Sequence, residues 1–249
     1  MCFELDSVPP IPVIRGAAVS HDHLVLESAD GTEFAAFGAI SDEPTGAGIA
    51  ILPDVRGLYR FYEELALRFA ERGYEAVAFD YFGRTAGVSG RDDEFDYMEH
   101  VRRTKPDEVQ ADVAAVVAHL RKTCQNIFTV GFCFGGRHSW LAAAAGHGLA
   151  GAVGFYGRPG EGADGSPGPA QRAPDMEAPI LALMGGADEG IGPEDVKAFE
   201  QALDQSGVEH EVVTYPGAPH SFFDRRQEAF ADASADAWQR VLAFVKRYS

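Results

Sequence analysis

The sequence predicts an α/β fold: one domain, residues 1–249, built on a mostly parallel, doubly wound sheet with helices on both faces. Short apolar runs alternate along the chain with amphipathic segments of helical spacing, which is the pattern of a parallel sheet with crossover helices. Two runs split by the turn residues Asp30 and Gly31 predict an antiparallel hairpin at the N-terminal edge of the sheet. The length of 249 residues suits one domain with a sizeable core, and no break in composition divides it.

From residue 46 onward, strands alternate with helices or loops. The strand at 46–54 is a short apolar run that ends in polar turn residues, and the helix at 60–73 carries apolar residues at helical spacing before the stop signal Gly73. The Gly- and Pro-rich segment 158–175 is expected to be a loop without secondary structure over the carboxyl edge of the sheet. The other predicted elements are a strand at 74–83, a helix at 106–123, a strand at 126–131, a helix at 135–146, strands at 150–157 and 179–186, a helix at 193–203, a strand at 210–215 and a helix at 231–249.

The charge and cysteine content argue against several classes of protein. Acidic residues outnumber basic ones by 38 to 21, for a net charge of −17, which argues against a nucleic-acid partner or an anionic membrane. The three cysteines include no CxxC pair, so neither a disulfide framework nor a metal site is expected. No stretch has the pattern of a signal peptide or a membrane span, so we expect a cytoplasmic protein, either a monomer or a small homo-oligomer.

The segment GFCFGG, residues 131–136, has the spacing of the G-x-S-x-G turn that presents a nucleophile, with Cys133 in place of serine. A strand is predicted to end at Gly131 and a helix to begin near Gly135, so Cys133 would lie at a strained bend with a positive φ. The positive end of the helix dipole favours a thiolate at this position. The alternative is a glycine-rich turn that holds an inert, buried cysteine.

A nucleophilic cysteine needs a base, and the base needs an acid that orients it. In hydrolases with this alternation of elements, the chain order is nucleophile, acid and histidine. Asp188 and His220 each follow a predicted strand, so both are expected at the carboxyl edge of the sheet. Glu189 is the rival acid, but the spacing after the strand favours Asp188. Cys133, Asp188 and His220 are therefore the predicted catalytic triad.

Two backbone N–H groups are predicted to form the oxyanion hole. One belongs to Phe134, directly after the nucleophile, and the other to Val55, in the loop after the strand at 46–54. The remaining histidines have weaker cases for a role in catalysis. His138, for example, falls inside the predicted helix 135–146, where we expect a packed or solvated side chain.

These motifs resemble those of the dienelactone hydrolase (carboxymethylenebutenolidase) family. The segments GFCFGG, GADEG, PGAPHSFF and ERGYEAVAFDYFGR carry the resemblance, which extends from about residue 33 to residue 245. It implies an α/β-hydrolase fold, no cofactor, and the hydrolysis of dienelactone to maleylacetate. It also assigns the triad to Cys133, Asp188 and His220.

The resemblance further implies three accessory residues. Asp54, at the position where well-known members of the family have glutamate, would hold the resting thiol. Arg84, in the segment DYFGR, would bind a carboxylate of the substrate. Arg225 would correspond to a second such arginine, although it comes one position later than in the family, with Asp224 in its place. Surface solvation is the alternative for both arginines.

The expected reaction is the cleavage of a small, anionic ester or lactone through a thioester on Cys133. Thiolate is a good nucleophile and also a good leaving group. Cysteine therefore suits a lactone whose ring-opened product rearranges, such as an enol that becomes a ketone, and this favours enol-lactones over simple alkyl esters. Two alternatives stay open: a non-catalytic or redox-sensing small-molecule binder, and an acyltransferase or thioesterase.

Overall fold

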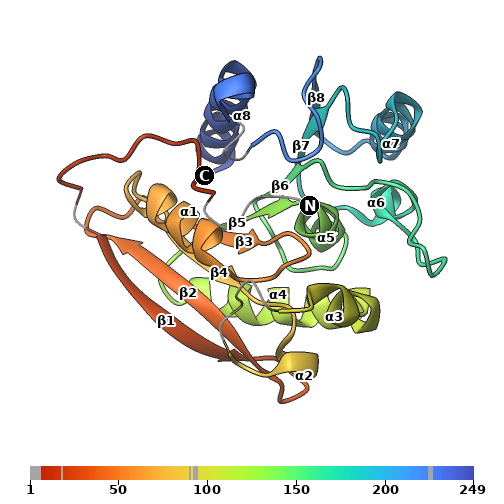
Figure 1. Ribbon diagram of the computed structural model, residues 1–249. Helices are drawn as coiled ribbons and strands as arrows, with labels where there is room; N and C mark the ends of the chain where they lie inside the picture. The colour runs from red at the N-terminus through yellow and green to blue at the C-terminus, as the bar shows by residue number, and fades with distance from the viewer. Residues whose placement is uncertain (1–6, 18, 90, 92–94, 224–226) are drawn as a thin grey trace.

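Eight strands form one mixed sheet at the centre of the molecule (Figure 1). The computed structural model describes residues 7–17, 19–89, 91, 95–223 and 227–249. The order across the sheet is β1-β2-β4-β3-β5-β6-β7-β8, with β1/β2 and β2/β4 antiparallel and every other pair parallel. This arrangement confirms the predicted fold class. The strands are β1 (Val19–Glu27), β2 (Glu33–Ser41), β3 (Ala47–Leu52), β4 (Glu75–Phe79), β5 (Asn126–Phe132), β6 (Gly151–Phe155), β7 (Ile180–Gly185) and β8 (His210–Tyr215).

Helices cover both faces of the sheet. α1 (Arg60–Ala70) and α8 (Gln227–Tyr248) pack on one face, and α4 (Pro106–Leu120), α5 (Phe134–Ala143) and α7 (Pro193–Ser206) pack on the other. Because both faces are covered, the inner strands are mostly apolar, and all 6 residues of β3 are buried. Within the described ranges, no helix has the length and hydropathy of a membrane span.

The spacing of apolar residues along α1 explains its packing. Phe61, Leu65 and Phe69 lie on one face of the helix and are buried against the sheet. The helix ends at Ala70, and Gly73 follows with a φ of +87°, a left-handed conformation that glycine adopts without strain. The chain then turns directly into β4, as the sequence predicted.

The hairpin between β1 and β2 turns at residues 28–32. The N–H of Ser28 donates to the carbonyl oxygen of Thr32 at 2.9 Å, and Gly31 adopts a φ of +82°. β1 lies at the edge of the sheet and pairs with β2 from Val19 to Glu27. The structure thus confirms the antiparallel edge predicted from the turn residues.

Short elements occur where the sequence analysis expected none: α2 (Gly83–Ala86), α3 (Tyr97–Arg103), α6 (Pro169–Arg172) and a 3₁₀ turn at Ala173–Asp175. The expectation of an unstructured loop over 158–175 was therefore wrong for its second half. Proline opens α6, and the N–H of Gly168 donates to Oε1 of Gln171 at 2.9 Å. This local cap stabilises a turn that a Gly- and Pro-rich composition does not suggest.

Candidate active site

Cys133 lies at the bend between β5 and α5. Its φ is 54° and its ψ is −111°, so it adopts the positive φ expected of a residue at a strand-to-helix turn. Its N–H donates to the carbonyl oxygen of Phe155, at the end of β6, at 3.0 Å. The bend therefore sits at the carboxyl ends of two neighbouring parallel strands, where ligands bind in open α/β sheets.

The two glycines that flank Cys133 are required by close packing. A Cβ atom at Gly131 would lie 2.0 Å from the carbonyl oxygen of Gly135. A Cβ atom at Gly135 would lie 2.1 Å from the carbonyl oxygen of Leu52, at the end of β3. Glycine at both positions lets the start of α5 approach β3 and β5, which explains why the motif has glycines two residues before and two after the cysteine.

His220 and Asp188 form a direct pair. His220 Nδ1 lies 2.6 Å from Asp188 Oδ2, and the Asp188 side chain is only 2% exposed. The N–H of Gly190 donates to the other carboxylate oxygen at 2.8 Å. Burial raises the pKa of Asp188, but the hydrogen bond and charge of His220 outweigh it and hold the pKa below its usual value. The rival acid, Glu189, is exposed.

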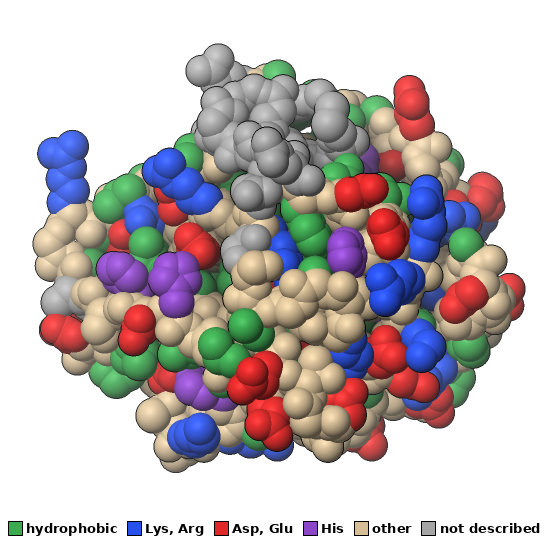
Figure 2. Space-filling model, turned by 60° about the horizontal axis from the view of Figure 1, so that its bottom comes forward, with side chains coloured by type: hydrophobic (Ala, Val, Ile, Leu, Met, Phe, Trp, Pro, Cys, Tyr) green, Lys and Arg blue, Asp and Glu red, His purple; other side chains and the backbone are tan. Residues whose placement is uncertain are grey.

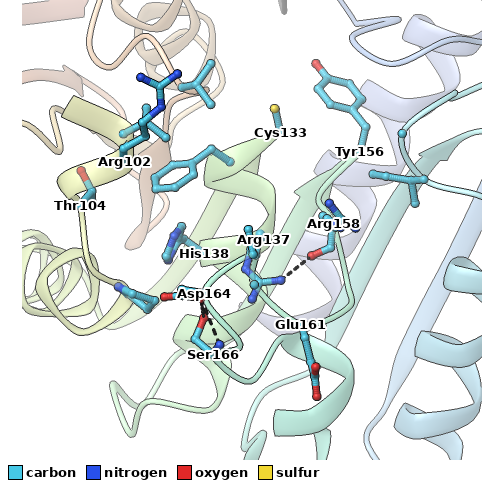
Figure 3. A pocket seen from close by; sticks show the side chains of 18 of the residues that line it. Arg102, Thr104, Cys133, Arg137, His138, Tyr156, Arg158, Glu161, Asp164 and Ser166 are labelled. Carbon is cyan, nitrogen blue, oxygen red and sulfur yellow. Dashed lines mark hydrogen bonds between the residues drawn. The ribbon is translucent and has the colours of Figure 1, made fainter. Parts of the chain in front are cut away.

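A cavity of about 660 Å³ opens over the bend (Figure 3), and its lining is mostly apolar. Cys133 and His220 both line it, and so do the two residues predicted to supply the oxyanion hole, Phe134 and Val55. Part of the segment 158–175 forms one wall, as expected of a loop over the carboxyl edge of the sheet. The lining also includes Val101, Arg102, Thr104, Pro106, Arg137, His138, Tyr156, Arg158, Glu161, Gly162, Ala163, Asp164, Ser166, Gly190 and Ile191.

Backbone strain is concentrated around this cavity. Among the described residues other than glycine, positive φ angles occur at Cys133, Tyr156 and Ser221. Cys133 and Tyr156 line the cavity, and Ser221 directly follows His220. The rings of Tyr156 and His220 are 4.9 Å apart. Such strain is held in place only by the surrounding structure and is typical of functional sites.

Asp54 follows β3, as predicted, but its carboxylate has a cationic partner. Oδ2 accepts from Nη2 of Arg56 at 2.9 Å, and Oδ1 accepts from the N–H of Arg56 at 2.9 Å. Burial lowers the pKa of Arg56, but the hydrogen bond and charge of Asp54 outweigh this effect, so that the pKa lies above its usual value. Burial raises the pKa of Tyr81, and the charges of Asp54 and Cys133 add to that effect, so carboxylate and thiol lie within electrostatic reach of one phenol.

Comparison with known proteins identifies the family. Residues 34–249 match the model of the dienelactone hydrolase family. The chain belongs to this family. It is therefore a hydrolase of the ester and lactone class with the α/β-hydrolase fold, as its sequence predicted.

Individual relatives agree with this assignment. The carboxymethylenebutenolidase of Rhodococcus opacus is 31% identical over 263 residues, which cover 100% of this chain and 97% of the relative. An Escherichia coli K12 protein, provisionally named a carboxymethylenebutenolidase, is 32% identical over 207 residues, covering 80% of this chain and 76% of its own. The crystal structure of a Klebsiella pneumoniae protein, provisionally named a dienelactone hydrolase, matches with a TM-score of 0.81 at 27% identity, covering 93% of this chain and 100% of its own.

Arg84, predicted from the family pattern to bind a substrate carboxylate, is placed elsewhere. It lies on α2 and is not among the residues that line the cavity. Its Nε donates to Asp30 Oδ2 at 2.9 Å, and its Nη1 donates to Asp112 Oδ2 at 2.8 Å. Two carboxylates from the hairpin turn and α4 thus hold the guanidinium away from the cavity, which does not support the predicted role. Arg225 lies outside the described residues.

Most residues that line the cavity were not predicted as site residues, and they include Arg137 and His138, on α5. His138 was expected to be packed or solvated. It is packed, with 2% of its surface exposed, and burial lowers its pKa to about 3. Yet its ring also borders the cavity. For Arg137 the available signal was its position four residues after Cys133 on the helix that begins at the bend, because residues one turn apart share a helix face.

Proposed function

We propose that the protein hydrolyses a small ester or lactone with Cys133 as nucleophile, His220 as base and Asp188 as the group that orients His220. The observation that carries the proposal is the 2.6 Å pair between His220 and Asp188, together with the cavity that Cys133 and His220 line in common. A positioned base with an acid behind it is the requirement for activating a weak nucleophile.

In the proposed reaction, His220 takes the proton of Cys133 and the thiolate attacks the carbonyl carbon. The N–H groups of Phe134 and Val55 stabilise the oxyanion that forms. The intermediate collapses with cleavage of the C–O bond, and the proton on His220 goes to the departing oxygen. Water, deprotonated by His220, then attacks the thioester, and the carboxylic acid product and the Cys133 thiol are released.

The proposed substrate class is a small enol-lactone with an anionic group. A tetrahedral intermediate can expel the thiolate again, but an enol leaving group that becomes a ketone makes ring opening irreversible. The cavity of about 660 Å³ has a mostly apolar lining with a few polar groups, which suits a small molecule. The Rhodococcus opacus relative carries the name carboxymethylenebutenolidase, which is in line with this class.

We also propose that Asp54 controls the resting state of the thiol. A thiolate held permanently beside a protonated histidine would be alkylated and oxidised readily. A buried carboxylate near the thiol disfavours the thiolate by charge repulsion. Since Asp54 is paired with Arg56, the strength of that pair would set how much negative charge the thiol experiences.

The test is turnover of a chromogenic ester and of an enol-lactone by the wild type, Cys133→Ala and Cys133→Ser. We expect Cys133→Ala to lower kcat/KM by about 10⁴-fold or more while the thermal midpoint stays close to that of the wild type, because loss of a covalent nucleophile costs many decades. Rapid acid quench and mass spectrometry should find the acyl group on the Cys133 peptide. Activity of Cys133→Ala within about tenfold of the wild type would contradict the proposal, and a strict need for an acceptor other than water would indicate an acyltransferase.

A further inference from the structure

Most described arginines form ion pairs with carboxylates, as a chain of net charge −17 allows. Figure 2 shows acidic and basic side chains interspersed over one face of the molecule. Within the described ranges, the arginines without an ion pair are Arg15, Arg102, Arg121, Arg137 and Arg158. Three of these, Arg102, Arg137 and Arg158, line the cavity over Cys133. Three of the five arginines that form no ion pair therefore lie around one cavity, although the carboxylates of Glu161 and Asp164 line it too.

Arg137 is the most buried of the three. It follows Cys133 by four residues on α5, which places it one helical turn, or about 6 Å, further along the same face. Its Nη1 donates to the carbonyl oxygens of Arg158, at 3.1 Å, and of Gly160, so the loop after β6 fixes the guanidinium (Figure 3). Its Nη2 is buried and has no hydrogen-bond partner among the described residues.

Asp164, whose carboxylate also lines the cavity, attracts the Arg137 guanidinium without forming an ion pair with it. Its Oδ1 accepts from the N–H of Ser166 at 3.0 Å and from the Ser166 hydroxyl at 2.7 Å, and it forms no ion pair with Arg137. The attraction between the charges of Asp164 and Arg137 is therefore weaker than that of a direct ion pair. Burial lowers the pKa of Arg137, and the charge of Arg158 acts in the same direction.

His138 adds a second unsatisfied nitrogen to the same wall. Its Nδ1 is buried without a hydrogen-bond partner in the described part of the chain, and its ring packs 4.4 Å from that of Phe134. With its pKa lowered to about 3, the imidazole is neutral at physiological pH. Buried polar atoms in native proteins are almost always paired, so two unpaired ones on consecutive residues call for an explanation. A polar group of a bound substrate would supply the partner.

We propose that Arg137 is the specificity-determining residue of this site and binds a carboxylate of the substrate, with His138 as a neutral hydrogen-bonding group beside it. The proposal rests on the proposed function and names the residue that gives it anion selectivity. A guanidinium presents paired donors that match a carboxylate, and partial burial strengthens the contact. Arg102 and Arg158 are exposed and attract the anion toward the cavity.

The preference of the site for anions can be measured without catalytic turnover. Cys133 is alkylated with iodoacetate and with iodoacetamide, and with 3-iodopropionate and its amide, in the wild type, Arg137→Gln, Arg137→Lys and Arg15→Gln. In each case the thiolate displaces iodide, and the two reagents of a pair differ in one negative charge. Peptide mass spectrometry gives the acid-to-amide rate ratio at Cys133. Arg15 is exposed, unpaired among the described residues and outside the cavity lining, so Arg15→Gln is the matched control for the loss of one positive charge.

We expect Arg137→Gln to lower the acid-to-amide ratio at Cys133 by about tenfold for at least one reagent pair, since a charge-assisted hydrogen bond contributes a factor of that order. Arg137→Lys should restore part of the ratio, because it retains the charge, and Arg15→Gln should leave it unchanged. An equal ratio in the wild type and Arg137→Gln for both reagent pairs would overturn the proposal.

A second experiment compares kcat/KM for a carboxylate-bearing lactone and for its neutral methyl ester. Arg137→Gln should lower the value for the carboxylate by about 10- to 100-fold, mainly through KM, and leave the methyl ester within about threefold. Equal losses on both substrates would mean that Arg137 only holds the loop carbonyls of Arg158 and Gly160, and would overturn the proposal. A wild type that cleaves neither substrate would contradict the proposed function instead, while the alkylation ratio would still decide the role of Arg137.

Discussion

The Asp54 carboxylate and the Arg56 guanidinium form an ion pair at 2.9 Å, on either side of Val55 in the loop after β3. Asp54 is fully buried and the Arg56 side chain is 11% exposed. Arg56 also lies over the ring of Tyr59, 4.4 Å from its centroid. The loop that is predicted to supply an oxyanion N–H is thus fixed by a buried pair, and each partner depends on the other to offset the cost of burial.

Asp54→Asn should speed the alkylation of Cys133 at neutral pH, because removal of a negative charge near the thiol favours the thiolate. It should also lower the free energy of unfolding by about 2–4 kcal/mol, because Arg56 loses its anionic partner. Iodoacetamide labelling followed by peptide mass spectrometry measures the rate. Cys124 is the internal control, because burial and the nearby Glu75 raise its pKa to about 11 and it should label slowly in both proteins. An unchanged Cys133 rate would mean that Asp54 does not control the thiol.

His138→Phe should make the protein less sensitive to acid. Because burial lowers the folded-state pKa of His138 to about 3, below the unfolded value of 6.5, the unfolded chain binds the proton first. Its contribution to stability is therefore complete above pH 6.5 and decreases as the pH falls toward 3. Between pH 7 and pH 5 the free energy of unfolding should fall by about 2 kcal/mol more in the wild type than in His138→Phe. Urea unfolding at both pH values measures the difference, and His21→Phe, on the exposed edge strand, is the control. An equal decrease in the free energy of unfolding in the wild type and in His138→Phe would contradict the prediction.

Arg84→Ala should destabilise the protein and leave its choice of substrate unchanged. The substitution leaves Asp112, whose side chain is 1% exposed, without its cationic partner, so the free energy of unfolding should fall by about 2–4 kcal/mol. The kcat/KM ratio for the carboxylate-bearing lactone and its methyl ester should stay within about twofold of the wild-type ratio, in contrast to Arg137→Gln. If Arg84→Ala lowered kcat/KM for the carboxylate-bearing lactone alone, Arg84 would have to bind the substrate after all.

Gly135→Ala should destabilise the bend at Cys133 and abolish most of the activity. The added Cβ atom would lie 2.1 Å from a backbone oxygen of β3, which has little freedom to move. We expect the free energy of unfolding to fall by about 2 kcal/mol or more, as for other overpacked sites. Gly160→Ala is the matched control, because nothing lies within 4 Å of its added Cβ atom. If the two variants proved equally stable, the packing argument for the glycine would be wrong.

Much of the fold follows from local pattern in the sequence. The alternation of apolar runs with amphipathic segments predicted the inner strands and the five long helices, because the side-chain periods of strand and helix depend only on the local backbone. The short helices α3 and α6 were not predicted, because their stability comes from caps and contacts with the rest of the domain rather than from a periodic apolar face.

For the candidate site too, local sequence predicted some features and tertiary packing decided the others. The sequence by itself determined the bend at Cys133 and the order in which Asp188 and His220 follow strand ends, and parallel strands bring those ends to one edge of the sheet. Only the tertiary structure decided the partners of the arginines. Arg84 pairs with Asp30 and Asp112, which lie 54 and 28 residues away along the chain, whereas Arg137, at the cavity, forms no ion pair with a described residue. The direction of a long side chain and the charges that meet it depend on how distant segments pack, and that packing is not encoded in any short stretch of the sequence.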